Sequence, residues 1–168
     1  MIKVMAVRSP KWGSRFICWG LGEPASHLAI QVGDRVFHAE LKDGFHFVTV
    51  SNFLSGHEVV DSCVVEDGKT WEDGVGDALD TEDGLPYDQP AFVYFAWRAF
   101  LRKVFRIPFP KTNIEDRPWE LICVEAMERL DDSLCFFTGR DPKTLPEVNF
   151  AMMSPMDAVA YAKRVWTG

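Results

Sequence analysis

The chain has 168 residues, 47% hydrophobic and 13% aromatic, so it can bury a sizeable apolar core and is expected to form one globular domain over residues 1–168. This composition excludes an intrinsically disordered chain. The formal net charge of -7 argues against nucleic acid as a partner, because the long-range field of the protein repels phosphate backbones.

The first expected elements are a strand over Ile2 to Arg8 and a short helix over Lys11 to Leu21, ended by Gly20 or Gly22. The N-terminal residues lack the apolar run of a signal peptide, and no later stretch is long and apolar enough to span a membrane. We therefore expect a protein that is cytoplasmic as synthesised and has no membrane span.

The clearest strand signal follows. The apolar runs Ser26 to Val32 and Arg35 to Leu41 are joined by Gly33-Asp34, a two-residue connection typical of a tight hairpin. Pairing around this turn places His27 opposite a residue near position 40.

Two further strands are expected over Phe45 to Val50 and Glu58 to Glu66, separated by a polar turn at Asn52 to His57. Residues Glu66 to Gly84 are rich in Asp, Glu and Gly, which indicates a solvated excursion with a short helix over Thr70 to Leu79. The strands together predict an antiparallel sheet of about five strands.

The C-terminal half is predicted to be helical. Apolar residues recur at helical spacing over Gln89 to Phe105, a second helix over Trp119 to Leu130 contains Cys123, and Ser154 caps a last helix from about Pro155 to Trp166. The fold class that follows is α+β, with the sheet packed against helices.

Among the four cysteines, Cys123 is the candidate nucleophile. It lies in the first turns after Asp116-Arg117-Pro118, and the positive end of a helix favours a thiolate. Cys18, Cys63 and Cys135 are expected to be structural, since they lie among apolar residues and form no Cys-x-x-Cys pair.

A histidine on a stiff strand suits the role of base for that thiol, and His27 is the candidate. Its second ring nitrogen needs an orienting group from the adjoining strand. His38 and Glu40 lie on one face of that strand, two residues apart, so either residue can take this role. His46 and His57 have the context of surface or loop residues.

Three segments carry a family resemblance. Residues 26–34, followed by Val36-Phe37-His38-Ala39, resemble the histidine strand pair of the circularly permuted papain-like (NlpC-type) group, which includes YiiX-like cell-wall amidases and lecithin:retinol acyltransferase-like proteins. Ile122-Cys123-Val124-Glu125 is similar to the Tyr-Cys-Ser-Glu of that group, and Gly84-Leu85-Pro86-Tyr87-Asp88 to its Gly-x-x-Tyr-Asp element. The matches run from about Ser14 to Leu130, which leaves residues 131–168 as a C-terminal helical extension.

The resemblance implies a permuted papain-like fold and a cysteine peptidase or amidase, with Cys123 as nucleophile, His27 as base and His38 as orienting group. Tyr87 and Glu40 would contact the substrate. The implied substrates are amides, such as peptidoglycan stem peptides, or acyl groups on lipids. A cell-wall substrate would require delivery by a phage particle or a lysis system.

Two alternatives to an amidase remain open. Ile122 and Val124 stand where the group commonly has Tyr and a small hydroxyl residue, which favours a catalytically weak structural or interaction protein with the same fold, of phage origin. The other alternative is a lipid acyltransferase. We expect no cofactor and no metal, because a metal site built from His27, His38 and Glu40 would lack a further ligand in the sequence.

Overall fold

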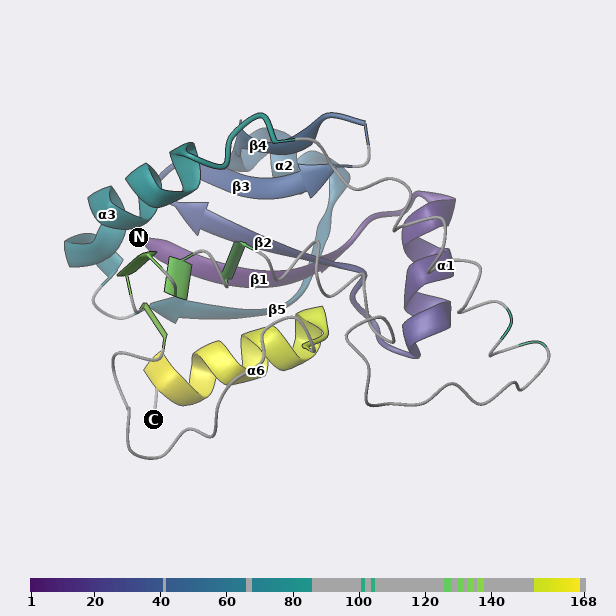
Figure 1. The fold of residues 1–168 in the computed structure, drawn as a ribbon. Coiled ribbons are helices and arrows are strands. Elements are labelled where there is room, and N and C mark those ends of the chain that lie inside the picture. Colours follow the sequence, from purple (N-terminus) through teal and green to yellow (C-terminus); the bar gives the residue numbers. More distant parts are fainter. Residues whose placement is uncertain are drawn as a thin grey trace.

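The computed structural model describes residues 1–40, 42–65, 68–85 and 153–166, together with residues 101, 104, 126, 127, 130, 131, 133, 134, 136 and 137. Within these residues the fold is α+β, with one antiparallel sheet of five strands (Figure 1). No helix in this part of the chain has the length and apolarity needed to cross a membrane.

The strands are β1 (Ile2–Arg8), β2 (His27–Val32), β3 (Arg35–Glu40), β4 (Gly44–Thr49) and β5 (Glu58–Val65). They are ordered β4-β3-β2-β1-β5, and each neighbouring pair is antiparallel. The antiparallel sheet of about five strands is therefore confirmed.

The β2–β3 hairpin turns at Gly33-Asp34, as predicted. Gly33 has a φ of 62°, in the left-handed region that glycine adopts without a Cβ clash. Ile30 pairs with Phe37, which fixes the register of the two strands. The hairpin thereby places alternate residues of both strands on a common face.

The two faces of the sheet are covered differently. One face carries the main core and packs against α3 (Gly68–Asp80) and α6 (Pro155–Trp166). The other face packs against α2 (Val50–Gly56), which lies behind the strands in Figure 1. Phe53 of this helix forms a smaller apolar cluster with Met5, Val7, Ala29 and Val36 of the strands. We call the two faces the core face and the α2 face.

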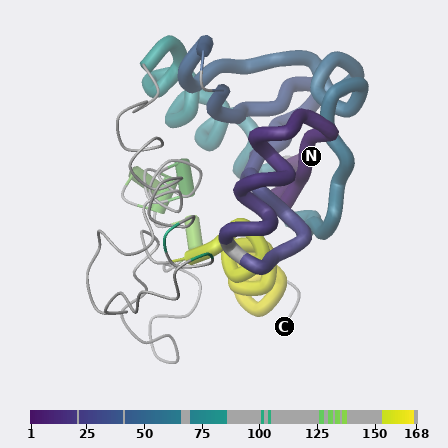
Figure 2. The backbone as a smooth tube through the Cα atoms, turned by 90° about the vertical axis from the view of Figure 1, so that its right-hand side faces the viewer, coloured from purple at the N-terminus to yellow at the C-terminus, as the bar shows by residue number. Residues whose placement is uncertain are grey.

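The helix α1 (Trp12–Leu21) lies beyond the end of the sheet, where β1 ends and β2 begins (Figures 1 and 2). It ends at Gly22, whose φ of 77° is again left-handed. The last helix begins as predicted, because Ser154 Oγ accepts a hydrogen bond from the Asp157 N–H at 3.1 Å.

The polar turn predicted at Asn52 to His57 is wrong, because residues 50–56 form α2. Thr49 caps this helix by accepting a hydrogen bond from the Asn52 N–H at 3.4 Å. Phe53, 2% exposed, is the buried anchor that attaches α2 to the sheet. One buried apolar residue in a seven-residue helix is too little to produce a periodic sequence pattern.

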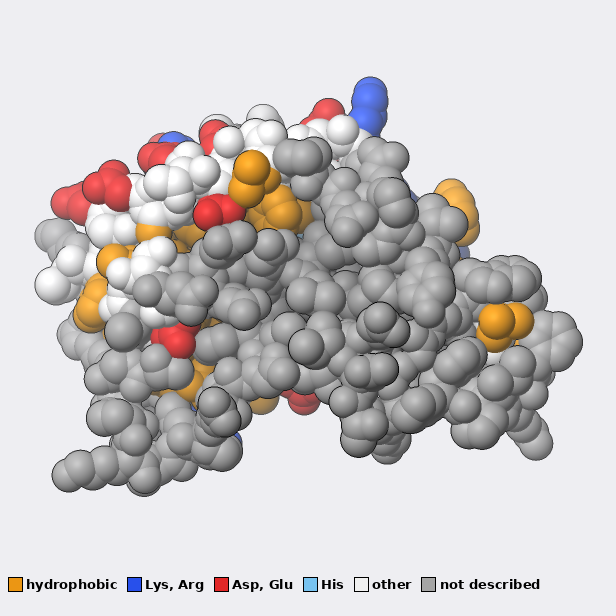
Figure 3. Space-filling model, viewed as in Figure 1, with side chains coloured by type: hydrophobic (Ala, Val, Ile, Leu, Met, Phe, Trp, Pro, Cys, Tyr) orange, Lys and Arg blue, Asp and Glu red, His pale blue; other side chains and the backbone are white. Residues whose placement is uncertain are grey.

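The helix predicted within the acidic segment exists as α3, but the segment is not simply a solvated excursion. Val75 and Leu79 are fully buried in the core, while acidic side chains gather on the outside of the helix (Figure 3). The amphipathic arrangement makes α3 part of the cover of the core face.

The C-terminal part of the chain also contributes to the core face. Ala126, Met127 and Leu130 are helical and buried, in agreement with the helix predicted around Cys123. Phe136 packs against Trp166 of α6, with ring centroids 4.8 Å apart. Most of the helix expected over residues 89–105 lies outside the described residues.

Candidate functional site

All four histidines of the chain gather on the α2 face of the sheet. The His38 ring centroid lies 5.7 Å from that of His27, 4.6 Å from that of His46 and 5.7 Å from that of His57. The His27 and His57 ring centroids are 6.2 Å apart. We call these four residues the histidine cluster, with His38 at its centre.

Strand alternation places three of these rings. His27 shares a face with Ala29, and His38 shares it with Val36, two residues of the smaller apolar cluster. His46 lies directly opposite His38 in the β3–β4 register. The structure thus brings together the sequence-predicted pair His27 and His38, and adds a third histidine from β4.

His57 reaches the cluster because α2 ends there. Its Nδ1–H donates to the Phe53 carbonyl oxygen at 3.0 Å, and its ring stacks on the Phe53 ring. This bond fixes the neutral tautomer that carries the lone pair on Nε2. The sequence context of His46 and His57 predicts surface or loop residues and gives no sign of their place in the site.

Burial governs the charge of the central histidines. It lowers the pKa of His38 to about 2, with smaller contributions from the neighbouring His27, His46, His57 and Lys11. Burial and, to a smaller extent, His57 lower the pKa of His27 to about 3. Both rings are therefore neutral imidazoles at neutral pH. His38 Nδ1 is buried and has no hydrogen-bond partner within the described part of the chain.

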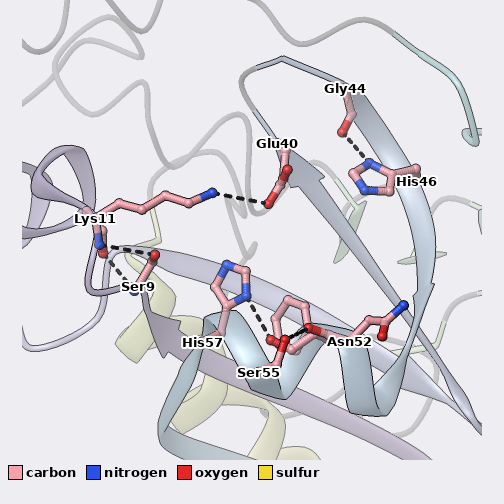
Figure 4. Close-up of polar contacts among 10 residues, drawn as sticks. Ser9, Lys11, Glu40, Gly44, His46, Asn52, Ser55 and His57 are labelled. Carbon is pink, nitrogen blue, oxygen red and sulfur yellow. Dashed lines mark hydrogen bonds and ion pairs between the residues drawn. The ribbon is translucent and has the colours of Figure 1, made fainter.

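A carboxylate borders the cluster. Glu40, two residues beyond His38 on the same face of β3, offers a carboxylate oxygen, and its ligand atom and those of His38 and His57 all lie within 4.8 Å of one another. Lys11 Nζ is 3.9 Å from Glu40 Oε1, and Figure 4 shows the lysine side chain reaching toward Glu40, with the His57 ring below them. The Lys11 side chain is 74% exposed, so this ion pair is weak.

A cleft of about 460 Å³ opens beside His57, between the start of α1 and the end of α2. Two of its lining residues form a bidentate ion pair, in which Arg8 donates to Glu58 at 2.9 and 2.7 Å. Arg15 of α1 also lines it and is exposed. The volume falls in the range of small-molecule sites, so a cleft of ligand size lies next to the histidine cluster.

The remaining predicted site residues, Cys123 and Tyr87, lie outside the described residues, as does Cys135. Cys63 is buried in the core, and burial raises the pKa of its thiol. Burial also raises the pKa of Cys18 on α1, although a hydrogen bond with Ser26 lowers it in part. Both thiols have the environment of structural cysteines, as expected.

Comparisons of the chain with protein-family models, with curated proteins and with solved structures give no match. Its chemistry therefore has to be inferred from the residues of the site.

Proposed function

We propose that the chain is a cysteine hydrolase with a circularly permuted papain-like fold, in which Cys123 attacks an amide carbonyl and His27 accepts the thiol proton. His38 orients His27. The observation that carries this proposal is the placement of His27 and His38 side by side on neighbouring strands, with ring centroids 5.7 Å apart and planes inclined by 76°.

Burial makes His27 a weak base unless a negative charge lies beside it. Its depressed pKa keeps the ring unprotonated at neutral pH but also lowers its affinity for a proton, since a general base works best with a pKa near the working pH. A thiolate next to the ring would stabilise the imidazolium and raise this pKa, because an opposite charge favours the charged form. The proton transfer therefore depends on Cys123 lying beside His27.

The proposed reaction requires the Cys123 thiol to contact a histidine on the opposite face of the sheet from Ala126 and Met127. Ala126 and Met127 belong to the core face, whereas His27 is the first residue of β2 and lies on the α2 face. Leu28, the next residue, belongs to the same core cluster as Ala126 and Met127. A contact thus requires the Cys123 thiol to reach His27 around the end of the sheet at which β2 begins.

In the proposed reaction His27 removes the thiol proton and the sulfur of Cys123 bonds to the carbonyl carbon. The amide C–N bond then breaks, and the amine leaves with the proton from His27. Water, deprotonated by His27, hydrolyses the thioester and restores the thiol. The cleft beside His57 would hold a short peptide segment, and the family resemblance favours a peptidoglycan stem peptide.

Alkylation of the full chain with iodoacetamide, followed by mass mapping of all four cysteines, tests the catalytic pair. Cys123 should react faster than Cys18, Cys63 and Cys135, and His27→Ala should slow it by at least about tenfold, since general bases contribute that much or more. His46→Ala is the matched control, because this residue belongs to the same cluster and lies one strand beyond His38.

Slow labelling of all four cysteines at similar rates would refute the proposal, and so would equal effects of His27→Ala and His46→Ala. A hydrolysis assay completes the test. The wild-type chain should release a new amine from peptidoglycan peptides, and Cys123→Ser should release none. Turnover of a phospholipid in place of the peptide would assign the site to a lipid acyltransferase.

A further inference from the structure

We propose that His38, Glu40 and His57 form a binding site for one divalent transition-metal ion, with Zn²⁺ as the best fit. The three side chains come from two places in the sequence, the end of β3 and the residue after α2, and the fold brings them to one point. The metal site considered from the sequence combined His38 and Glu40 with His27. In the structure the histidine that joins His38 and Glu40 is His57.

The ligand atoms of the three residues lie slightly farther apart than they would around a bound zinc ion. The three ligand atoms lie within 4.8 Å of one another. Around a tetrahedral zinc ion, bonds of about 2.0 to 2.2 Å place ligand atoms about 3.4 Å apart. A shift of about 1.4 Å in these atoms, which rotation of the partly exposed Glu40 side chain can provide, would complete the geometry.

His57 is held as metal-binding histidines usually are. Such a histidine donates its second ring N–H to a carbonyl or carboxylate, which fixes the tautomer and aims the other nitrogen at the metal. The Nδ1–H of His57 donates to the Phe53 carbonyl oxygen, and stacking on Phe53 holds the ring plane. Nε2 is therefore the nitrogen that His57 presents to a ligand.

His38 gives an independent indication. This residue is 4% exposed, and its Nδ1 has no hydrogen-bond partner among the described residues. A buried polar atom without a partner costs free energy, so native structures usually satisfy such atoms by protein, water or ion. Coordination by His38 would place an ion beside the side chain that carries this unpaired nitrogen.

The donor set selects the class of ion. Two imidazoles and one carboxylate suit zinc and its neighbours in the first transition series, whereas calcium and magnesium require oxygen ligands. Three protein ligands also leave a coordination position for water or another ligand. Lys11 is the cation that faces Glu40, and its long, exposed ion pair offers little resistance to displacement.

Titration of the full chain, freed of metal with a chelator, tests the site directly. Calorimetry with Zn²⁺ and the visible absorption of bound Co²⁺ should both show one ion per chain. Glu40→Gln and His57→Ala should each weaken binding by at least about tenfold, because even changes to groups that only support metal ligands have effects of this size. Glu58→Gln is the matched control, since this carboxylate borders the cleft but is paired with Arg8.

The proposal is overturned if the wild-type chain does not bind one Zn²⁺ or Co²⁺, or if Glu40→Gln binds as tightly as wild type. A thiolate charge-transfer band in the Co²⁺ spectrum would also overturn it, because it would assign a cysteine as ligand. Circular dichroism checks that each variant folds, and the surface position of Glu40 keeps one variant informative if His57→Ala does not fold. The readout is independent of Cys123 alkylation, so failure of the hydrolase proposal and failure of the metal site are distinguishable.

Discussion

The rings of Phe53 and His57 stack on one another, with centroids 4.3 Å apart and planes inclined by 11°. Phe53 also meets His38 edge to face, at a centroid distance of 4.9 Å. One buried aromatic side chain therefore contacts two members of the histidine cluster and the apolar residues of the α2 face at the same time. The positions of both rings depend on how well α2 packs.

Phe53→Ala should lower the free energy of unfolding by about 3 kcal/mol, since it removes a buried aromatic ring and leaves a cavity. Urea denaturation monitored by circular dichroism measures the change. Leu54→Ala is the control, because Leu54 is the next residue of the same helix, is 47% exposed, and should change stability by less than about 0.5 kcal/mol. Equal stabilities of the two variants would contradict the packing role of Phe53.

The lowered pKa values of His38 and His27 predict a pH dependence of stability in the metal-free protein. In the folded chain the pKa is about 2 for His38 and about 3 for His27, against an ordinary value of 6.5. Above pH 6.5 both the folded and the unfolded state carry neutral rings. As the pH falls below 6.5, the unfolded chain takes up protons that the folded chain does not, so stability decreases. At pH 5 the expected loss is about 2 kcal/mol for each of the two histidines.

Urea denaturation between pH 7.5 and 5, with a chelator present, measures this slope. Within the described part of the chain, the titratable groups that face His38 are His27, His46, His57, Lys11 and Glu40. His38→Gln should flatten the slope, because it removes one of the two rings that resist protonation. A free energy of unfolding that stays constant between pH 7.5 and 5 would contradict the prediction, because it would show that His27 and His38 are protonated in the folded state as readily as in the unfolded state.

Much of this arrangement could be predicted from local sequence rules. The two-residue turn at Gly33-Asp34 fixes the hairpin register, and the period of two in a strand then puts His27 and His38 on one face. The same parity applies to His46, and Asp43-Gly44 at the connection between β3 and β4 is a turn signal, with a φ of 74° at Gly44, but it was not used to fix the register of these two strands. His46 could not be aligned with His38 without that register.

Two features could not be predicted because packing decides them. Ser51, Asn52 and Ser55 make residues 50–56 look like a turn, and only the burial of Phe53 against the sheet makes them a helix. His57 enters the cluster as a consequence of that helix. Burial of α3 was missed for a similar reason, since its acidic residues outnumber the buried Val75 and Leu79.

The hairpin turn itself can be tested. Gly33→Ala should destabilise the chain by about 1 to 2 kcal/mol, because φ is 62° there and left-handed backbone is unfavourable for residues with a Cβ. The added Cβ would also lie 2.5 Å from Glu72 Oε1. Gly13→Ala is the control, since Gly13 lies in α1 with open space around its Cβ position, and alanine there should stabilise by up to about 1 kcal/mol. Thermal unfolding of both variants distinguishes a strained turn from a general intolerance of glycine replacement.

Addition and removal of metal should change the stability of the chain if the proposed site is correct. An ion that binds only the folded state stabilises it by about 2.7 kcal/mol when its free concentration is one hundred times the Kd. Zn²⁺ should therefore raise the Tm of the wild-type chain and of Glu58→Gln, and a chelator should reverse the rise. Binding of Zn²⁺ to cysteines and histidines of the unfolded chain acts in the opposite direction and is common to all variants. Glu40→Gln keeps that opposing effect and binds the ion at least about tenfold more weakly, so at the same Zn²⁺ concentration its stabilisation should be about 1.4 kcal/mol or less, and an increase in Tm equal to that of wild type would place the bound ion elsewhere.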